Sequence, residues 1–315
     1  MIHYLRHDEI DTDKWDQCIR KSFNSLVYGY SWYLDVVCHE WDGLVEDDYV
    51  RVMPLTGKRK AGIHYLYQPF FTQQLGIFST GRLNNQKVSE FLQQVPKKYK
   101  LAEINLNTFN KPVDDSQPSW KAMLNFELDL ISSHEELRLQ YSKNLKRNIR
   151  KAEKAKLELM ENIKPEEVIR IFRGSAVSRK SNFNEEAYRM LKQLIYVLIY
   201  RGRAKVWGAF DHRNSLLAGA VFVRSKNKWI FLFSGTSLDA REKGAMPFII
   251  DRFILNHAGS HSTLDFEGSN DQNLARFYKS FGAKQCVYYH YQKNRLPFWA
   301  RYAKNAMDLL QKSFS

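Results

Sequence analysis

The sequence predicts a two-domain protein of the mixed α/β class. The chain has 315 residues, more than a single domain usually holds. Apolar residues make up 44% of it, enough for sizeable cores. Segments with the period of a strand and segments with the period of a helix alternate along the whole chain, an order typical of sheets covered by helices.

The first part of the chain mixes both kinds of element. The first 20 residues read as a short strand and a helix, with Trp15 and Ile19 on its buried side. The elements that follow are a helix at 31–38, strands at 49–54 and 62–67 joined by a turn at 56–59, a helix at 88–95, and strands at 101–106 and 124–130.

An amide-rich stretch follows the predicted hairpin. Gln68, Gln73 and Gln74 alternate with aromatic and apolar residues around Pro69. Such a turn can hold a substrate by hydrogen bonds and stacking. It can equally be a buried connector whose amides satisfy backbone groups. Both interpretations stay open at this point.

Residues 135–157 predict one long amphipathic helix with a basic second half. Its apolar positions recur every three or four residues: Leu137, Tyr141, Leu145, Ile149 and Ala152. The cations far outnumber the single acid Glu153 in this half, so i,i+4 pairs cannot offset their repulsion. The helix is either a solvated face or a ridge that faces phosphates, with Lys146, Arg147 and Arg150 as candidate contacts.

The second half predicts a regular series of elements after a first strand near 157–160. In order we expect helices at 165–178 and 185–200, strands at 204–210, 216–223 and 229–234, a helix at 246–257, a strand at 263–266, a helix after 271 and a strand at 287–292. Pro165 suits the first helical turn of its helix.

The most informative stretch is residues 262–283. Asp265 and Glu267 lie two residues apart, so an extended strand places both carboxylates on one face. Ser269, Asn270 or Asp271 can cap the next helix, in which Leu274, Phe277, Tyr278 and Phe281 form an apolar face, and Gly282 can end it. The pattern also fits an ordinary strand–helix connection.

The run Asn-Leu-Ala-Arg-Phe-Tyr-Lys-Ser-Phe-Gly at 273–282 has Asn, Ala, Tyr and Gly in the same order as the Asn-x-x-Ala-x-x-x-Tyr-x-x-x-Gly signature of the GNAT (GCN5-related) acyltransferase superfamily, at shorter spacings before the Tyr, and in this order it resembles that signature. The run at 141–154 resembles a segment of the Fem-type aminoacyltransferases, a branch with tandem GNAT-like domains. The resemblance implies a degenerate first domain at 1–130, a second at 131–295 with the active site, and a helix at 296–315 that packs back on the first.

The resemblance also implies where a donor binds. In GNAT domains the fourth and fifth strands splay apart around acyl-CoA, and the pyrophosphate lies on backbone N–H groups where the fourth strand leads into a helix. Here that connection supplies Ser234, Gly235, Arg241, Lys243, Gly244 and Ala245, and Asn273 belongs to the following helix. Met246 stands where the family has a small residue, a departure that leaves the phosphate loop in doubt.

For the chemistry, the resemblance implies a carboxylate base and a tyrosine acid. Glu267 is the first candidate base and Asp265 the second, since an amine nucleophile must lose a proton. Tyr278 is the candidate acid for the leaving group, although its place on an apolar helix face also fits a plain core residue.

Composition limits the partners. The net charge of +14 favours phosphate-bearing partners: acyl-CoA, such as acetyl-CoA, tRNA or an anionic membrane surface. The cysteines lack CxxC spacing and the histidines lack HxxxH pairs, so no metal is expected, and the cysteine usage fits the cytoplasm. No apolar run is long enough for a transmembrane segment. We therefore expect an N-acyltransferase acting on a small-molecule or peptide amine; the alternatives are an aminoacyl-tRNA-dependent Fem-type transferase of peptidoglycan bridges and an inactive GNAT-like module that binds RNA.

Overall fold

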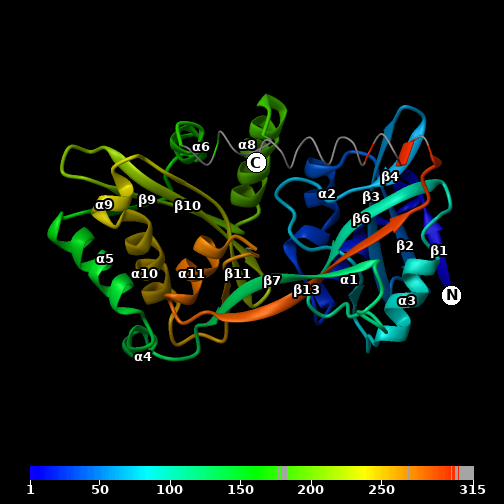
Figure 1. Cartoon of the computed structure of the whole chain (residues 1–315), viewed down its shortest axis with the longest axis horizontal. Helices are drawn as coiled ribbons and strands as arrows, with labels where there is room; N and C mark the ends of the chain where they lie inside the picture. Colours follow the sequence, from blue (N-terminus) through cyan, green and yellow to red (C-terminus); the bar gives the residue numbers. More distant parts are fainter. Residues whose placement is uncertain (176–177, 179–182, 269, 299, 302–303, 305–315) are drawn as a thin grey trace. The chain divides into compact units, whose positions relative to one another are not determined.

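The computed structural model describes the chain except for residues 176–177, 179–182, 269, 299, 302–303 and 305–315 (Figure 1). The chain forms two compact units. Unit 1 comprises Met1–Ala122 and Tyr288–Ser315, and unit 2 comprises Met123–Val287. The sequence analysis placed the division near residue 130 and the end of the second domain at 295.

Unit 1 is built on a mixed sheet. Its strands lie in the order β1 (Ile2–Leu5), β2 (Trp41–Glu46), β3 (Arg51–Lys60), β4 (Ile63–Leu66), β6 (Tyr99–Leu106) and β13 (Lys284–Asn294), with β5 (Phe78–Ser79) paired to β3. Only β4 and β6 are parallel. Its helices are η1 (His7–Glu9), α1 (Thr12–Lys21), η2 (Val27–Gly29), α2 (Ser31–Val37) and α3 (Asn85–Gln93).

Two predictions in unit 1 were wrong in detail. The segment 56–59 lies inside β3, and the hairpin turns instead at Ala61 and Gly62, whose φ angles of 48° and 78° suit a tight two-residue turn. Gly57, read as a turn residue, lets the Tyr99 ring approach β3. Strand β2 was not predicted; it carries Trp41, which is fully buried.

Unit 2 holds the second sheet. Its strands lie in the order β7 (Trp120–Asp129), β12 (Thr263–Asp265), β11 (Lys228–Thr236), β10 (Leu216–Ser225), β9 (Ala204–Phe210) and β8 (Glu158–Glu161). Only β11 and β12 are parallel. Its helices are α4 (His134–Leu139), α5 (Lys143–Lys154), α6 (Pro165–Arg173), α8 (Glu185–Tyr200), α9 (Ala240–Lys243), α10 (Ala245–His257) and α11 (Gln272–Lys279). This order confirms the series expected for the second half.

Helices cover both faces of the unit 2 sheet (Figure 1). On one face, Val168 of α6 lies against Gly219 of β10. On the other, Phe253 of α10 stacks on Phe222 of β10 with ring centroids 3.7 Å apart. The main apolar core of unit 2 lies on this second face, between the strands and α5, α10 and α11.

The long helix predicted at 135–157 is two helices. Ser133 caps α4 in a capping box with Glu136, and the hydroxyl of Ser142 accepts the N–H of Leu145 to cap α5. The continuous apolar period hid this break, because the buried residues on both sides of it contact the same core.

Most of the helix predicted at 296–315 lies outside the described residues. Within the described part of this segment, Leu296 and Ala300 pack on Leu101 of unit 1. Among the described residues, no helix combines the length and apolar character needed to cross a membrane.

Gly244 allows α5 to approach the α9–α10 junction closely. Its φ is 69°, and a Cβ there would lie 2.1 Å from the carbonyl oxygen of Asn148 on α5. No flexible side chain can relieve such a contact, because the obstructing atom belongs to the backbone of a helix. The glycine therefore fixes the distance between α5 and the start of α10.

We expect Gly244→Ala to destabilise the protein by about 3 kcal/mol or more, the sum of left-handed backbone strain and overpacking. Gly259→Ala is the matched control, since Gly259 has a φ of 73° and open space around its Cα. It should cost only about 1–2 kcal/mol. Urea unfolding of both variants measures the difference, and equal losses would contradict the packing role of Gly244.

Candidate functional site

Strands β11 and β12 separate after a short paired segment. Their register runs from Lys228↔Thr263 to Ile230↔Asp265 and ends there. Beyond it, β11 continues to Thr236, whereas the N–H of Phe266 donates to the carbonyl of Phe126 in β7. The expected separation of the two strands is thereby confirmed.

A β-bulge marks β11 where the pairing with β12 has ended. Val221 of β10 pairs with Phe233, but the next residue, Phe222, pairs with Phe231, so Leu232 is the extra residue. A bulge bends its strand and leaves backbone groups outside the ladder. The apolar run at 229–233 gave no sign of this bulge, because no glycine or polar residue interrupts it.

A cleft of about 930 Å³ opens where β11 ends. Its polar side chains come from α5, α9 and α11: Ser142, Asn144, Asn148, Arg241, Asn273, Arg276, Lys279 and Ser280. Its apolar wall includes Leu145, Met246, Pro247 and Phe277. No Asp or Glu is among the described residues that line it, so the cleft is suited to an anionic ligand.

The predicted donor-binding residues divide into two groups. Arg241 and Asn273 line the cleft. Gly235 instead lies against the backbone of α6, where a Cβ would meet the carbonyl oxygen of Val168 at 2.6 Å. Ser234 is half-buried next to it on β11, and Ala245 is buried in the first turn of α10.

Lys243 is engaged elsewhere. Its Nζ lies 3.0 Å from a carboxylate oxygen of Asp211, and this hydrogen bond helps to lower the pKa of Asp211 to about 2. Gly244 faces Asn148, so a helix of the protein occupies the space that a phosphate would need at this glycine.

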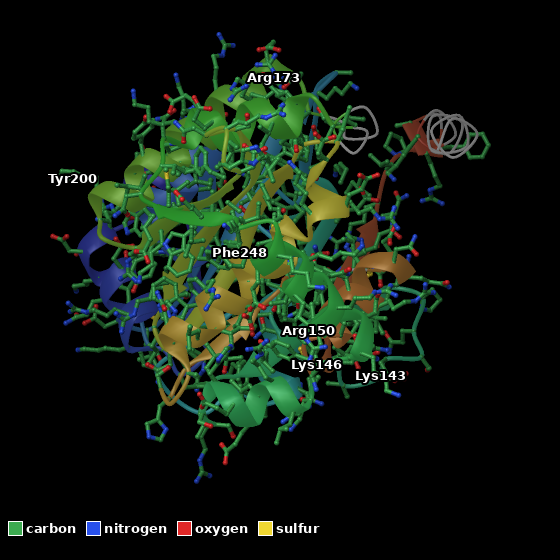
Figure 2. All side chains as sticks on the ribbon, turned by 90° about the vertical axis from the view of Figure 1, so that its left-hand side faces the viewer. Lys143, Lys146, Arg150, Arg173, Tyr200 and Phe248 are labelled. Atoms are coloured by element: carbon green, nitrogen blue, oxygen red, sulfur yellow. The ribbon has the colours of Figure 1, made fainter. Side chains whose placement is uncertain are left out.

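The basic ridge of α5 does not line the cleft. Figure 2 shows Lys143, Lys146 and Arg150 along α5 on the outer side of unit 2. The ammonium of Lys146 donates to the carbonyl of Leu139 over 3.2 Å. The guanidinium of Arg147 donates to Asn144 over 2.7 Å. Toward the cleft, α5 presents amides and Leu145 instead.

Asp265 is the buried member of a partly buried ion cluster. Only 2% of the residue is exposed; one carboxylate oxygen lies 3.2 Å from Nζ of Lys228, and the other accepts the N–H of Glu267 over 2.8 Å. Lys228 also lies 2.6 Å from Glu127. Burial alone would lower the pKa of Lys228, but the charges of Asp265 and Glu127 outweigh it and raise that pKa. Asp265 therefore fixes the strand end through its contacts with Lys228 and the N–H of Glu267.

Tyr278 and Glu267 lie beside this cluster. The Tyr278 ring stacks on Phe266 with centroids 4.9 Å apart, and its hydroxyl makes no hydrogen bond to the described residues. Burial, followed by the charges of Glu267 and Asp265, raises the pKa of Tyr278, so the phenol stays protonated. Glu267 is half-buried with a left-handed backbone at φ 59°. The structure thus brings the three predicted catalytic side chains into one region.

The predicted substrate amides belong to unit 1 and bind backbone groups. Gln68 donates to the carbonyl of Thr72 over 2.6 Å and accepts the N–H of Asn105 over 2.8 Å. Gln74 accepts the N–H of Thr108 and donates to the side chain of Gln73. These contacts fit the interpretation of this stretch as a connector whose amides satisfy backbone groups, and not as a substrate-binding turn.

Sequence reasoning missed several cleft residues. Arg276 and Lys279 are within the stretch that carried the family resemblance, yet only its apolar face was considered. Asn273, Arg276 and Ser280 recur at helical spacing on the polar side of α11, and Asn144 and Asn148 lie one turn apart on α5. This periodicity was the available signal.

Comparisons with known proteins show the fold. No family model and no curated protein matches the sequence. Among solved structures, FemX superposes with a TM-score of 0.63 at 11% identity, over 92% of this chain and 97% of that one. The C-terminal domain of a putative lysylphosphatidylglycerol synthetase from Agrobacterium fabrum gives a TM-score of 0.58 at 10% identity, over 96% and 95%. A conserved protein of unknown function from Bacteroides thetaiotaomicron gives 0.56 at 10% identity, over 93% and 99%. The chain has a Fem-like, GNAT-type fold.

We expect Lys228→Met to lower the free energy of unfolding by about 3–5 kcal/mol, because it leaves the carboxylates of Asp265 and Glu127 without a counter-charge. Arg170→Met is the control: it removes the exposed pair with Glu167 and should cost less than about 1 kcal/mol. Denaturant unfolding at neutral pH measures both. A loss at Lys228 no larger than that at Arg170 would contradict the structural role of the cluster.

Proposed function

We propose that the protein is an acyltransferase that moves an acyl or aminoacyl group from an activated, phosphate-bearing donor to an amine. The observation that carries this proposal is the separation of β11 and β12 beside a cleft whose described lining residues include cationic side chains and no acidic ones. The Fem-like, GNAT-type fold supports a transferase at the same coarse level.

The donor of first choice is an acyl-CoA, such as acetyl-CoA. Its phosphates would lie against Arg241, Arg276 and Lys279, which can each supply charge-assisted hydrogen bonds. The acyl chain would reach inward along the end of β11, where the bulge at Leu232 leaves backbone groups free of the ladder.

The transfer needs two proton movements. The amine nitrogen attacks the thioester carbonyl carbon, a C–N bond forms and the C–S bond breaks. The proton lost by the amine goes to the carboxylate of Glu267, directly or through water, and the leaving thiolate takes the proton of the Tyr278 hydroxyl. A phenol kept protonated by its buried site suits this second role.

A second candidate donor is aminoacyl-tRNA. The contact between Gly244 and Asn148 favours it, since the backbone loop expected to hold the CoA pyrophosphate is closed by α5. The exposed cations of α5 would add contacts to a nucleic-acid backbone.

Two measurements distinguish these donors. The first is the Kd for acetyl-CoA and for alanyl-tRNA, each at about 50 and about 200 mM salt, and the second is turnover of each donor with simple amines. Saturable acetyl-CoA binding with turnover supports the first donor. Turnover with alanyl-tRNA alone supports the second. RNA binding with steep salt dependence and no turnover with either donor would favour the inactive module.

We expect Tyr278→Phe to lower kcat by roughly 100-fold or more, because the leaving group loses its proton donor. Its free energy of unfolding should change by less than about 1 kcal/mol, since the hydroxyl has no partner to lose. Phe266→Leu is the control: it loosens the same ring stack but keeps the phenol, so stability should fall more than kcat. Equal losses of stability and kcat in Tyr278→Phe would mean that the ring only packs.

We expect Arg276→Gln to raise the Kd for the donor by about 10-fold, the loss of one charge-assisted hydrogen bond. Arg150→Gln on the outer side of α5 should change the Kd for acetyl-CoA less than about twofold, because Arg150 does not line the cleft. Isothermal titration with acetyl-CoA measures both variants. A larger effect at Arg150 than at Arg276 would contradict the cleft as the donor site.

A further inference from the structure

A second, smaller cavity lies at the other end of the unit 2 sheet. It has a volume of about 600 Å³ and surrounds the β10–β11 turn, the first residues of β9 and the C-terminal end of α10. Strand β11 begins at this cavity with Lys228 and Trp229 and ends at the donor cleft with Thr236. The two cavities are therefore separated by the length of one strand.

Basic side chains dominate this second cavity. Its lining includes Arg203, Lys205, Arg224, Lys226, His257 and His261, and no Asp or Glu is among its described lining residues. Like charges that converge from separate elements repel one another, and an anion at their centre would offset that repulsion.

Lys205 is the central cation. It is half-buried, and its Nζ lies 3.5 Å from Nε2 of His257 and 5.6 Å from the centroid of the Trp229 ring. Within the described part of the chain, no carboxylate lies within ion-pair distance of this ammonium. A half-buried charge without a counter-charge at a cavity wall is the feature that most directly indicates an anionic ligand.

The surroundings hold Lys205 in place. His257 approaches the carbonyl of Phe253 with Nδ1 at 2.8 Å, which leaves Nε2 to accept from Lys205. Burial has the largest effect and lowers the pKa of His257. The hydrogen bond to the Phe253 carbonyl opposes it, and the charges of Lys205, which lowers the pKa, and of Glu161, which raises it, have smaller effects.

Arg224 lies on the neighbouring strand β10 and is held by its backbone. Its N–H donates to the carbonyl of Arg203 over 2.7 Å, and its guanidinium lies 5.9 Å from the Trp229 ring centroid. Both Lys205 and Arg224 thus contact Trp229, which is itself 8% exposed. The aromatic face is covered, so the cavity offers donors to an anion but no surface on which a base could stack.

We propose that this cavity, defined by Lys205, Arg224 and their neighbours, is a second anion site that binds a phosphate group. Several donors converge from different elements, which suits a group with three or more acceptor oxygens better than a single carboxylate. The phosphate can belong to a small phosphorylated molecule or to a lipid headgroup at an anionic surface. The proposal is independent of the transferase function, because no residue is shared with the donor cleft.

The test measures binding of two probes to the full chain: inorganic pyrophosphate by calorimetry, and phosphatidylglycerol vesicles by co-sedimentation, both at about 50 mM salt. We expect pyrophosphate to bind with a Kd that rises at least 10-fold in the double variant K205Q/R224Q. Lys284→Gln, an exposed cation of unit 2 outside both cavities, should change that Kd less than twofold, as should the cleft variant Arg276→Gln.

The outcomes decide both the site and its source. Vesicle binding that is lost in K205Q/R224Q assigns the phosphate to a lipid headgroup, and pyrophosphate binding without vesicle binding assigns it to a small molecule. The proposal is overturned if neither probe binds, if K205Q/R224Q leaves the binding unchanged, or if Arg276→Gln weakens the binding as much as K205Q/R224Q does. If the double variant does not fold, as thermal unfolding would show, the single variant Arg224→Gln at an exposed position gives the same comparison with an expected change of about threefold or more.

Discussion

The candidate site in unit 2 depends on one constraint. Strand β12 pairs with both β11 and β7 up to Asp265, but beyond that residue the chain keeps a hydrogen bond only toward β7. The ion pairs of Lys228 with the buried Asp265 and with Glu127 hold three strands together at the point of divergence. Past this point Phe266 stays with β7, and β11 bends at Leu232. Because these ion pairs hold β11 and β12 together up to Asp265, the two strands begin to separate at that residue. Glu267 follows β12 just past this point and Tyr278 lies on α11; neither is among the described residues that line the cleft, but Asn273, Arg276 and Phe277 of the same helix are.

Helix α5 gives this opening its second wall. The close approach of Asn148 to Gly244 brings two amides of α5 to the cleft and turns its cations outward. In the proposed function, side chains from α9 and α11 take the phosphate-binding role that a glycine loop would have. A wall of arginine, lysine and asparagine side chains can adjust to donors of different size, whereas a backbone loop fits one pyrophosphate geometry.

The order of elements in unit 2 could be predicted because its helices and strands have clear periods and strong end signals, such as Pro165 and Asp271. The break at Ser142 could not, since the apolar period continues across it. The carboxylates and Tyr278 were found from local pattern and resemblance. Arg276 and Lys279 were missed because the residues that line the cleft with them on α5 and α9 are distant in sequence, and only the packing of α5 against Gly244 brings these elements together. In unit 1, Gly57 was misread because a glycine can serve a close approach as well as a turn.

Strand β13 has a consequence for how the chain is made. Tyr289 to Asn294 pair with β6 to complete the sheet of unit 1, yet the whole of unit 2 is synthesised between these two strands. During translation, the contiguous segment Met123–Val287 is finished before the last strand of unit 1 leaves the ribosome. Unit 2 can therefore form its native contacts first, while β6 lacks its pairing with β13 until the end of synthesis.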